Sequence, residues 1–115
     1  MDFIYLHVEA PDETSHAGDV TLKVRAIEEF DRLVVGPMLR GLERFDHFRV
    51  LLITDHFTPI PKRTHSDEPV PFVIYDSKVA RDGKKKKVGF NEHDAEEQGI
   101  FLENAFILMD RLVVK

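Results

Sequence analysis

Residues 48–75, "FRVLLITDHFTPIPKRTHSDEPVPFVIY", consist of two apolar runs joined by a polar loop. The first run, 48–54, is short and rich in aliphatic side chains, which predicts a buried strand. The second run, 69–75, confines its prolines to its start, where a missing backbone N–H costs least, and it predicts another strand. The chain is therefore organised around a strand–loop–strand unit, and its loop carries an Asp-His pair and a further histidine.

The segments before this unit predict another strand and a long helix. Residues 2–10, "DFIYLHVEA", are rich in apolar side chains and predict a strand that is largely buried on both faces. Residues 11–19 are predicted to form a loop. Asp19 is expected to cap an amphipathic helix over 20–42, where apolar residues recur at helical spacing.

Turn and helix signals complete the outline of the chain. A kink or break is expected at Gly36-Pro37, because proline removes a helical hydrogen bond. Asp82-Gly83 is typical of a hairpin turn. The C-terminal segment predicts a loop and then a helix. The apolar face of that helix is expected to contain Ala105, Leu108, Met109 and Leu112.

Buried strands that alternate with a long helix indicate an α/β layer structure. About three buried strands and two long helices make a thin unit, because a doubly covered sheet needs more helical cover than this. We therefore expect the 115 residues to be part of a larger domain.

The composition disfavours several classes of protein. A formal net charge of −5 and a pI near 5.6 argue against a nucleic-acid surface, which needs a basic field. No apolar run of about 18 residues predicts a membrane span, and the N-terminus lacks the features of a signal peptide. With no cysteine, disulfide and thiolate chemistry are excluded. We expect a cytoplasmic protein without nucleic-acid or membrane partners.

Acidic and imidazole side chains gather beyond the ends of the predicted strands. Asp12 and His16 follow the first strand, Asp55 and His56 follow the second, and His65 comes shortly before the third. In open α/β sheets this edge binds ligands. Mixed nitrogen and oxygen ligands suit a divalent transition metal such as Mn²⁺, Co²⁺ or Zn²⁺. Each pair alone is common by chance, so ordinary loop roles and metal binding both stay open at this point.

A family resemblance is carried, in order, by "HVEAPDETSHAGD", "AIEEFDRLVVGPML", "LLITDHFTPIPKRTHSDEPVPFVIY" and "GFNE". With these segments the chain resembles the C-terminal part of the archaeal-type 2,3-bisphosphoglycerate-independent phosphoglycerate mutases, which belong to the alkaline phosphatase superfamily. The most specific motifs are Pro-Asp-x-x-x-His, Thr-Asp-His-x-Thr-Pro and His-Ser-x-x-Pro-Val-Pro.

The resemblance implies a fold and a reaction. Residues 1–115 would be the C-terminal part of a three-layer α/β/α sandwich, without the domain's serine-bearing N-terminal part and its inserted domain. The intact enzyme would interconvert 3-phosphoglycerate and 2-phosphoglycerate through a phosphoserine intermediate, in glycolysis and gluconeogenesis. The isolated chain is expected to be inactive. Another phosphatase or phosphomutase of the superfamily and a non-catalytic interaction module remain open.

The resemblance also implies two divalent metal ions. Mn²⁺ is expected first, with Co²⁺, Zn²⁺ or Mg²⁺ as alternatives. The ligands implied for one metal are Asp12, His16 and His65. Asp55 and His56 match half of the ligands of the second metal, whose remaining ligands have no counterpart in this sequence.

Other charged residues fit simpler roles. Lys62 and Arg63 lie between two groups of expected ligands, where they are expected to steer a phosphate or carboxylate of the substrate. His93 is expected at the surface. Glu92 belongs to the resembling pattern without an assigned role. Apolar surface left uncovered on so thin a unit predicts a homo-oligomer.

Overall fold

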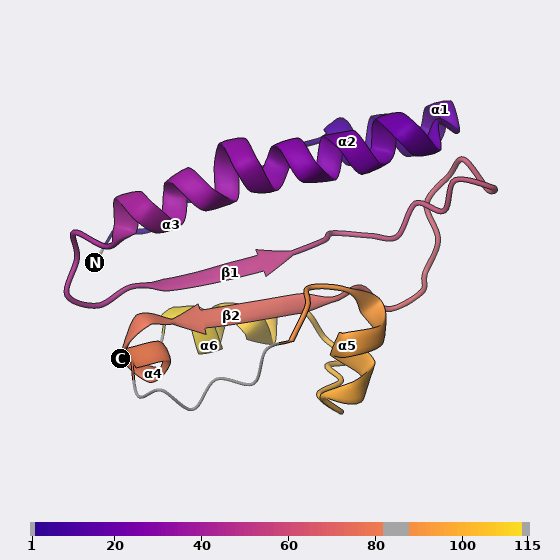
Figure 1. The fold of residues 1–115 in the computed structure, drawn as a ribbon. Helices are drawn as coiled ribbons and strands as arrows, with labels where there is room; N and C mark the ends of the chain where they lie inside the picture. Colours follow the sequence, from indigo (N-terminus) through magenta and orange to yellow (C-terminus); the bar gives the residue numbers. More distant parts are fainter. Residues whose placement is uncertain (1, 82–87, 114–115) are drawn as a thin grey trace. The chain divides into compact units, whose positions relative to one another are not determined.

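The fold is described by a computed structural model that covers residues 2–81 and 88–113 (Figure 1). The predicted hairpin turn at Asp82-Gly83 lies outside the described residues. No helix in the described part of the chain is long and apolar enough to cross a membrane.

The chain divides into two compact units. The first contains Met1–Arg44 and His56–Glu68, and the second contains Phe45–Asp55 and Pro69–Lys115. The loop between the two predicted strands therefore belongs to the same unit as the N-terminal helices.

The first unit begins with an extended segment instead of a strand. Residues 2–9 have no regular secondary structure, so the prediction of a strand over 2–10 is wrong for this structure. A strand needs the backbone groups of a neighbour. The only sheet among the described residues pairs two strands of the second unit, so this segment has no sheet to join.

Helix α1 (Ala10–Ala17) replaces the loop that the sequence predicts over 11–19. Pro11 lies in its first turn, where a missing N–H costs nothing, and acidic residues accompany it there. Gly18 ends the helix in the left-handed conformation, with φ 76°, and its N–H bonds the carbonyl of Ser15. These signals for a helix are present in the sequence.

The long helix is confirmed, and it runs as three consecutive segments, α2 (Val20–Phe30), η1 (Asp31–Val35) and α3 (Gly36–Leu42) (Figure 1). Asp19 caps it as predicted, because its carboxylate accepts a hydrogen bond from the N–H of Leu22 at 2.9 Å. The break expected at Gly36-Pro37 takes the form of η1, a π-helical turn that ends directly before Gly36, and the helix continues beyond it as α3.

The second unit contains both strands of the strand–loop–strand segment. Strand β1 (Arg49–Ile53) pairs antiparallel with β2 (Phe72–Asp76), which confirms these two strands. The register aligns Arg49 with Asp76 and Ile53 with Phe72. Most strand residues are half-buried, and the sheet has two strands instead of the predicted three buried ones. The structure is thus mixed α/β, with a smaller sheet than expected.

Three short helices complete the second unit: α4 (Ser77–Arg81), α5 (Glu92–Glu97) and α6 (Ile107–Val113). Helix α6 confirms a C-terminal helix, but over the described residues it has only seven residues and is not the second long helix that the sequence predicts.

The expected apolar face of the C-terminal helix is only partly right. Leu108 is buried, with 2% of its surface exposed, and Leu112 is half-buried. Met109 is exposed, as is Ala105, which lies before the helix begins. The helix has only seven residues, so its apolar face is short.

Asp76 ties the elements of the second unit together. Its Oδ2 accepts a hydrogen bond from Nε of Arg49 at 2.7 Å, and its Oδ1 lies 3.0 Å from Nε2 of His47. Oδ1 also accepts from the N–H of Lys78 at 2.9 Å, which caps α4. The hydrogen bond from Arg49, together with these contacts, outweighs burial and holds the pKa of Asp76 well below its ordinary value.

We expect Asp76→Asn to destabilise the protein by about 1–2 kcal/mol at neutral pH, because it removes charge-assisted hydrogen bonds. A lowered pKa in the folded state stabilises the fold above the unfolded pKa of about 3.9, and this stabilisation disappears as pH falls below it. The difference in unfolding temperature between the wild-type chain and Asp76→Asn should therefore become smaller in acid. Asp110→Asn, which changes an exposed carboxylate of α6, is the control and should leave stability unchanged at both pH values.

Candidate metal centre

Helix α1 presents two of the predicted ligands on one face. Asp12 and His16 lie four residues apart, a spacing that brings side chains together on a helix. Nε2 of His16 lies 3.2 Å from Oδ2 of Asp12. Asp12 is in the first turn and His16 in the last, where the helix dipole favours an acid and a base respectively.

A closed loop brings the other two histidines to the same unit. Phe57 and Ser66 form an isolated bridge, in which the N–H of Ser66 donates to the carbonyl of Phe57 at 2.9 Å. His56 and His65 flank this bridge, and their rings stack with centroids 3.6 Å apart. The loop therefore holds two imidazoles together although they are nine positions apart in the sequence.

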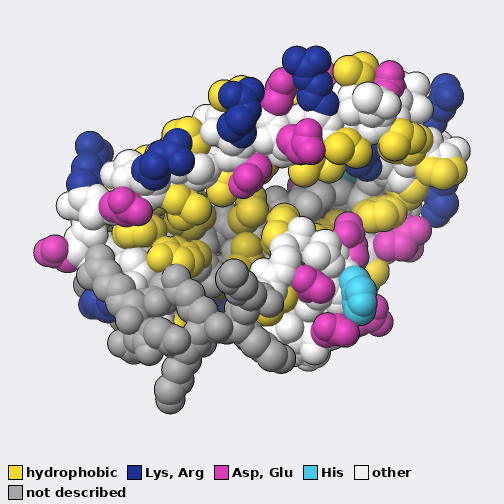
Figure 2. Space-filling model, viewed as in Figure 1, with side chains coloured by type: hydrophobic (Ala, Val, Ile, Leu, Met, Phe, Trp, Pro, Cys, Tyr) yellow, Lys and Arg dark blue, Asp and Glu magenta, His cyan; other side chains and the backbone are white. Residues whose placement is uncertain are grey.

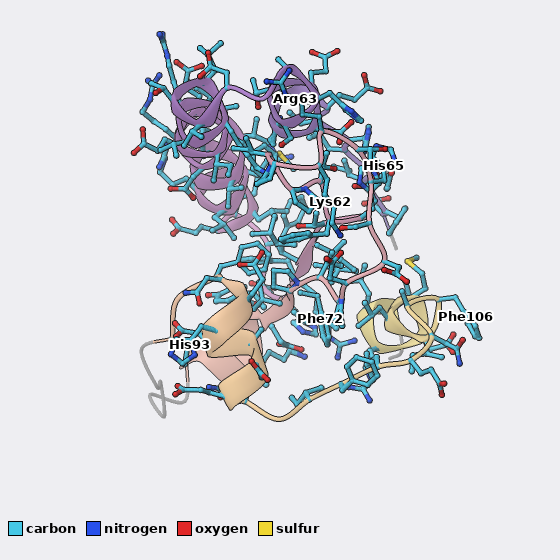
Figure 3. The ribbon with its side chains drawn as sticks, turned by 90° about the vertical axis from the view of Figure 1, so that its right-hand side faces the viewer. Lys62, Arg63, His65, Phe72, His93 and Phe106 are labelled. Atoms are coloured by element: carbon cyan, nitrogen blue, oxygen red, sulfur yellow. The ribbon has the colours of Figure 1, made fainter. Side chains whose placement is uncertain are left out.

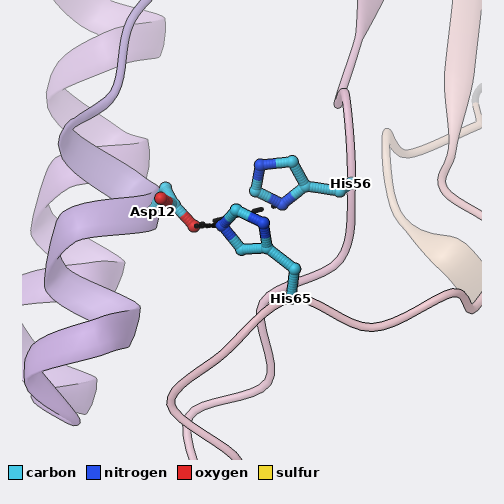
Figure 4. Close-up of side chains that lie close together, drawn as sticks. All are labelled: Asp12, His56 and His65. Atoms are coloured by element: carbon cyan, nitrogen blue, oxygen red, sulfur yellow. Dashed lines mark ion pairs between the residues drawn. The ribbon is translucent and has the colours of Figure 1, made fainter.

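The ring of His65 points toward the carboxylate of Asp12 (Figure 4). Nε2 of His65 lies 3.4 Å from Oδ1 of Asp12 and 3.1 Å from Nε2 of His16. Ligand atoms about 2.1 Å from one ion, at angles between octahedral and tetrahedral, lie about 3.0–3.4 Å from each other. The distance between the two Nε2 atoms falls in this range, and the carboxylate of Asp12 faces His16 with Oδ2 and His65 with Oδ1.

His56 joins the same group. Asp12, His56 and His65 each offer a ligand atom within 4.8 Å of the others. We call Asp12, His16, His56 and His65 the ligand cluster. Asp55, the expected partner of His56, is exposed and belongs to the second unit.

A backbone carbonyl fixes the tautomer of His16. Nδ1 of His16 lies 2.8 Å from the carbonyl oxygen of Arg63, which can only accept, so Nδ1 carries the hydrogen. In the neutral ring the lone pair is then on Nε2, which faces Asp12 and His65. Hydrogen bonds of this kind orient histidine ligands in metal sites.

Arg63 adopts a conformation that is unusual for its residue type. Its φ is 52°, in the left-handed region, which costs an arginine about 1 kcal/mol or more. Its guanidinium covers Gly18, where an added Cβ would lie 2.4 Å from Nε of Arg63. This contact and the hydrogen bond to His16 both join the loop to the end of α1.

Lys62 and Arg63, predicted to steer substrate, lie on the same loop as His65 (Figure 3). Both are exposed. Nζ of Lys62 pairs with Oε1 of Glu68 at 3.2 Å.

Thr58 is a polar residue of the site that the sequence prediction missed. Only 6% of its surface is exposed, and its hydroxyl donates to Oδ1 of Asp12 at 2.6 Å. Burial raises the pKa of Asp12, but the bond from Thr58 and the nearby His16 and His65 lower it, and the net pKa is below its ordinary value. Thr58 is part of the Thr-Asp-His-x-Thr-Pro motif, so a signal for it was present.

A second group of residues with metal-binding side chains lies on α5. His93, Asp94 and Glu97 are close together, and His93 is exposed, as predicted (Figure 3). The carboxylate of Asp94 accepts a hydrogen bond from the N–H of Gly89 at 2.6 Å, which gives it a local structural role. Glu92 is the first residue of this helix.

Comparison with known proteins identifies relatives of the chain. A family model described as the Metalloenzyme superfamily matches residues 1–108. A probable 2,3-bisphosphoglycerate-independent phosphoglycerate mutase of Geobacter sulfurreducens is 42% identical over 97% of this chain and 28% of its own length. The 2,3-bisphosphoglycerate-independent phosphoglycerate mutase of Methanothrix thermoacetophila is 55% identical over 86% of this chain and 25% of its own length.

A third relative, 2,3-bisphosphoglycerate-independent phosphoglycerate mutase 2 of Methanothermobacter thermautotrophicus, is 42% identical over 95% of this chain and 26% of its own length. The chain thus spans about a quarter of the length of these curated relatives. No solved structure matches the chain.

Proposed function

The chain belongs to the metalloenzyme superfamily, and on this premise we propose that it is the metal-binding C-terminal part of a cofactor-independent phosphoglycerate mutase. The intact protein would interconvert 3-phosphoglycerate and 2-phosphoglycerate through a phosphoserine, within glycolysis and gluconeogenesis. Its domain would be an α/β/α sandwich of the alkaline phosphatase type. The observation that carries the proposal is the convergence of the ligand cluster in a chain with these relatives.

Asp12, His16 and His65 are the proposed ligands of one divalent metal, and Asp55 with His56 those of a second. Mn²⁺ is the metal proposed first, with Co²⁺, Zn²⁺ or Mg²⁺ as alternatives. Bound there, the ions would act as Lewis acids on the oxygens of the transferring phosphoryl group.

The side chains of the site have separate tasks in this proposal. Asp12 stays ionised because its pKa is lowered, so it contributes a full negative charge. His16 presents the Nε2 lone pair that the Arg63 carbonyl fixes. The exposed ammonium of Lys62 and guanidinium of Arg63 attract the phosphate or carboxylate of the phosphoglycerate toward this loop.

Calorimetric titration of the chain with Mn²⁺, and separately with Zn²⁺, tests this proposal. We expect saturable binding of one ion with high affinity, because one chain contributes three converging ligands and leaves positions open for substrate oxygens. Asp55 and His56 alone make a half-site and should bind a second ion much more weakly. Titration curves without saturation for both metals would contradict the proposal.

We also expect the chain to form homo-oligomers in solution. Phe3, Ile4, Tyr5 and Leu6 are each more than half exposed, in a segment without a ladder partner among the described residues. Other large apolar side chains are exposed as well (Figure 2), among them Phe106 (Figure 3). Such surfaces favour association.

Sedimentation velocity measures this association. The wild-type chain should sediment as a dimer or larger species at micromolar concentration. A variant with Ile4→Asp and Leu6→Asp should shift toward the monomer, because it charges the exposed segment. A wild-type chain that stays monomeric at high concentration would show that these apolar residues do not mediate association.

A further inference from the structure

Thr58 is hydrogen-bonded to two members of the ligand cluster. It is one of the few buried polar residues in the described part of the chain, with 6% of its surface exposed. Its Oγ1 lies 2.6 Å from Oδ1 of Asp12 and 3.1 Å from Nδ1 of His56. Asp12 lies on α1 and His56 in the loop, so the hydroxyl joins the two segments that carry the ligands.

The direction of these hydrogen bonds follows from the number of hydrogens. A hydroxyl carries one hydrogen, and an ionised carboxylate can only accept, so the hydrogen of Thr58 goes to Asp12. The oxygen of Thr58 must then accept from Nδ1–H of His56. In a neutral His56 ring this places the lone pair on Nε2.

The main chain holds this hydroxyl in place. The carbonyl of Thr58 accepts a hydrogen bond from Nζ of Lys23 on α2 at 3.0 Å. Pro59 follows, and a residue before proline has a restricted backbone. Phe57, on the other side, forms the bridge that closes the loop. The position of the hydroxyl is therefore set by three independent constraints.

We propose that Thr58 is a positioning residue that sets the orientation of Asp12 and the tautomer of His56 at the same time. This inference rests on the proposed function, which gives Asp12 to one metal and His56 to the other. A single hydroxyl then links a ligand of each site. Removal of such a partner of a metal ligand typically weakens metal binding by 10–100-fold.

Thr58→Val and Thr58→Ser test the inference in the 115-residue chain. Valine has a similar shape without the hydroxyl, and serine keeps the hydroxyl without the methyl group. We expect Thr58→Val to raise the Kd for Mn²⁺ by about 10–100-fold, whereas Thr58→Ser stays close to wild type. Circular dichroism checks that each variant is folded, and Thr58→Ala replaces Thr58→Val if valine prevents folding.

A second measurement needs no metal and no activity. In alkaline buffer, long-range ¹H–¹⁵N spectra of the histidine side chains report which ring nitrogen carries the hydrogen. His56 should be the Nδ1–H tautomer in wild type and Thr58→Ser. In Thr58→Val it should shift toward a mixture of tautomers, a change that a loss of packing alone would not produce. His93 is the control and should not change.

The two measurements separate failure of the inference from failure of the proposed function. If wild type binds no metal but His56 shows the expected tautomers, the proposed function fails and the positioning role of Thr58 stands. If His56 of the wild type carries its hydrogen on Nε2, the inference is overturned. It is also overturned if a folded Thr58→Val keeps both the tautomer and the Mn²⁺ affinity, or if Thr58→Ser loses them.

Discussion

The purified 115-residue chain is expected to show no detectable interconversion of 3-phosphoglycerate and 2-phosphoglycerate in a coupled assay. The proposed reaction passes through a phosphorylated serine, and the serines here are in unsuitable places. Ser15 has no exposed surface and donates to the carbonyl of Pro11 at 2.6 Å. Ser77 is 2% exposed, and its hydroxyl accepts a hydrogen bond from the N–H of Phe48.

Ser66, the remaining serine, is half-buried in the bridge that closes the loop. The nucleophile is therefore proposed to come from the three quarters of the relatives' length that this chain does not match. Loss of a nucleophile that acts together with its metals typically costs several orders of magnitude in rate. Slow metal-assisted hydrolysis of an activated phosphate ester needs no serine and is compatible with this expectation.

Complementation turns this expectation into an experiment. The remaining length of the Methanothrix thermoacetophila relative, fused to this chain or added as a second chain, should restore mutase turnover. The same complementation with His16→Ala should fail, because it lacks a proposed ligand. If the 115-residue chain alone interconverts the two phosphoglycerates, and Asp55→Ala abolishes this activity, the need for an external serine is refuted.

His16→Ala and His65→Ala are each expected to weaken binding of the first metal by more than about 100-fold. Each substitution removes one of three converging donors. With only two protein ligands, the bound ion is little more stable than the hydrated ion in water, so the affinity falls. The matched control is His93→Ala, which removes a histidine of the second unit from a group of similar composition. Isothermal titration with Mn²⁺ compares the three variants with wild type.

The pattern across these variants decides where the ion binds. Unchanged affinity in His93→Ala, with loss in the other two, supports the ligand cluster. Loss in His93→Ala alone would instead locate the ion at α5. Equal loss in all three would mean that the substitutions act through stability, which thermal unfolding of the metal-free variants detects.

Sequence patterns correctly predicted the helices and strands that are specified by residues close together in the chain. The two strands of the second unit follow from short apolar runs, and the cap at Asp19 follows from its side chain. Helix α1 was missed although Pro11 and Gly18 mark its ends, because its polar residues resemble a loop. A strand over 2–10 was predicted from composition alone, whereas a strand also needs a neighbour that composition does not reveal.

The site shows the same division. The family resemblance, which the comparisons confirm, implied five ligands for two metals. The structure brings four of them close together, including His56, which was assigned to the second metal, but not Asp55. The roles of Thr58 and of the Arg63 carbonyl depend on a loop conformation with a left-handed arginine, which side-chain identity does not predict. Candidate ligand residues can thus be found from the sequence. The groups that orient them can be identified only when the conformation of the backbone is known.

Because α1 is short, the positions of its two members of the ligand cluster depend on the tertiary contacts that stabilise this helix. A helix of eight residues is below the length of about 12–15 residues at which isolated helices become stable in water. Its two turns persist because Thr58 holds Asp12 near its first turn and the Arg63 carbonyl holds His16 in its last. An ion bound at the proposed site would connect α1 to the loop, so metal binding would stabilise this helix and helix formation would in turn favour metal binding.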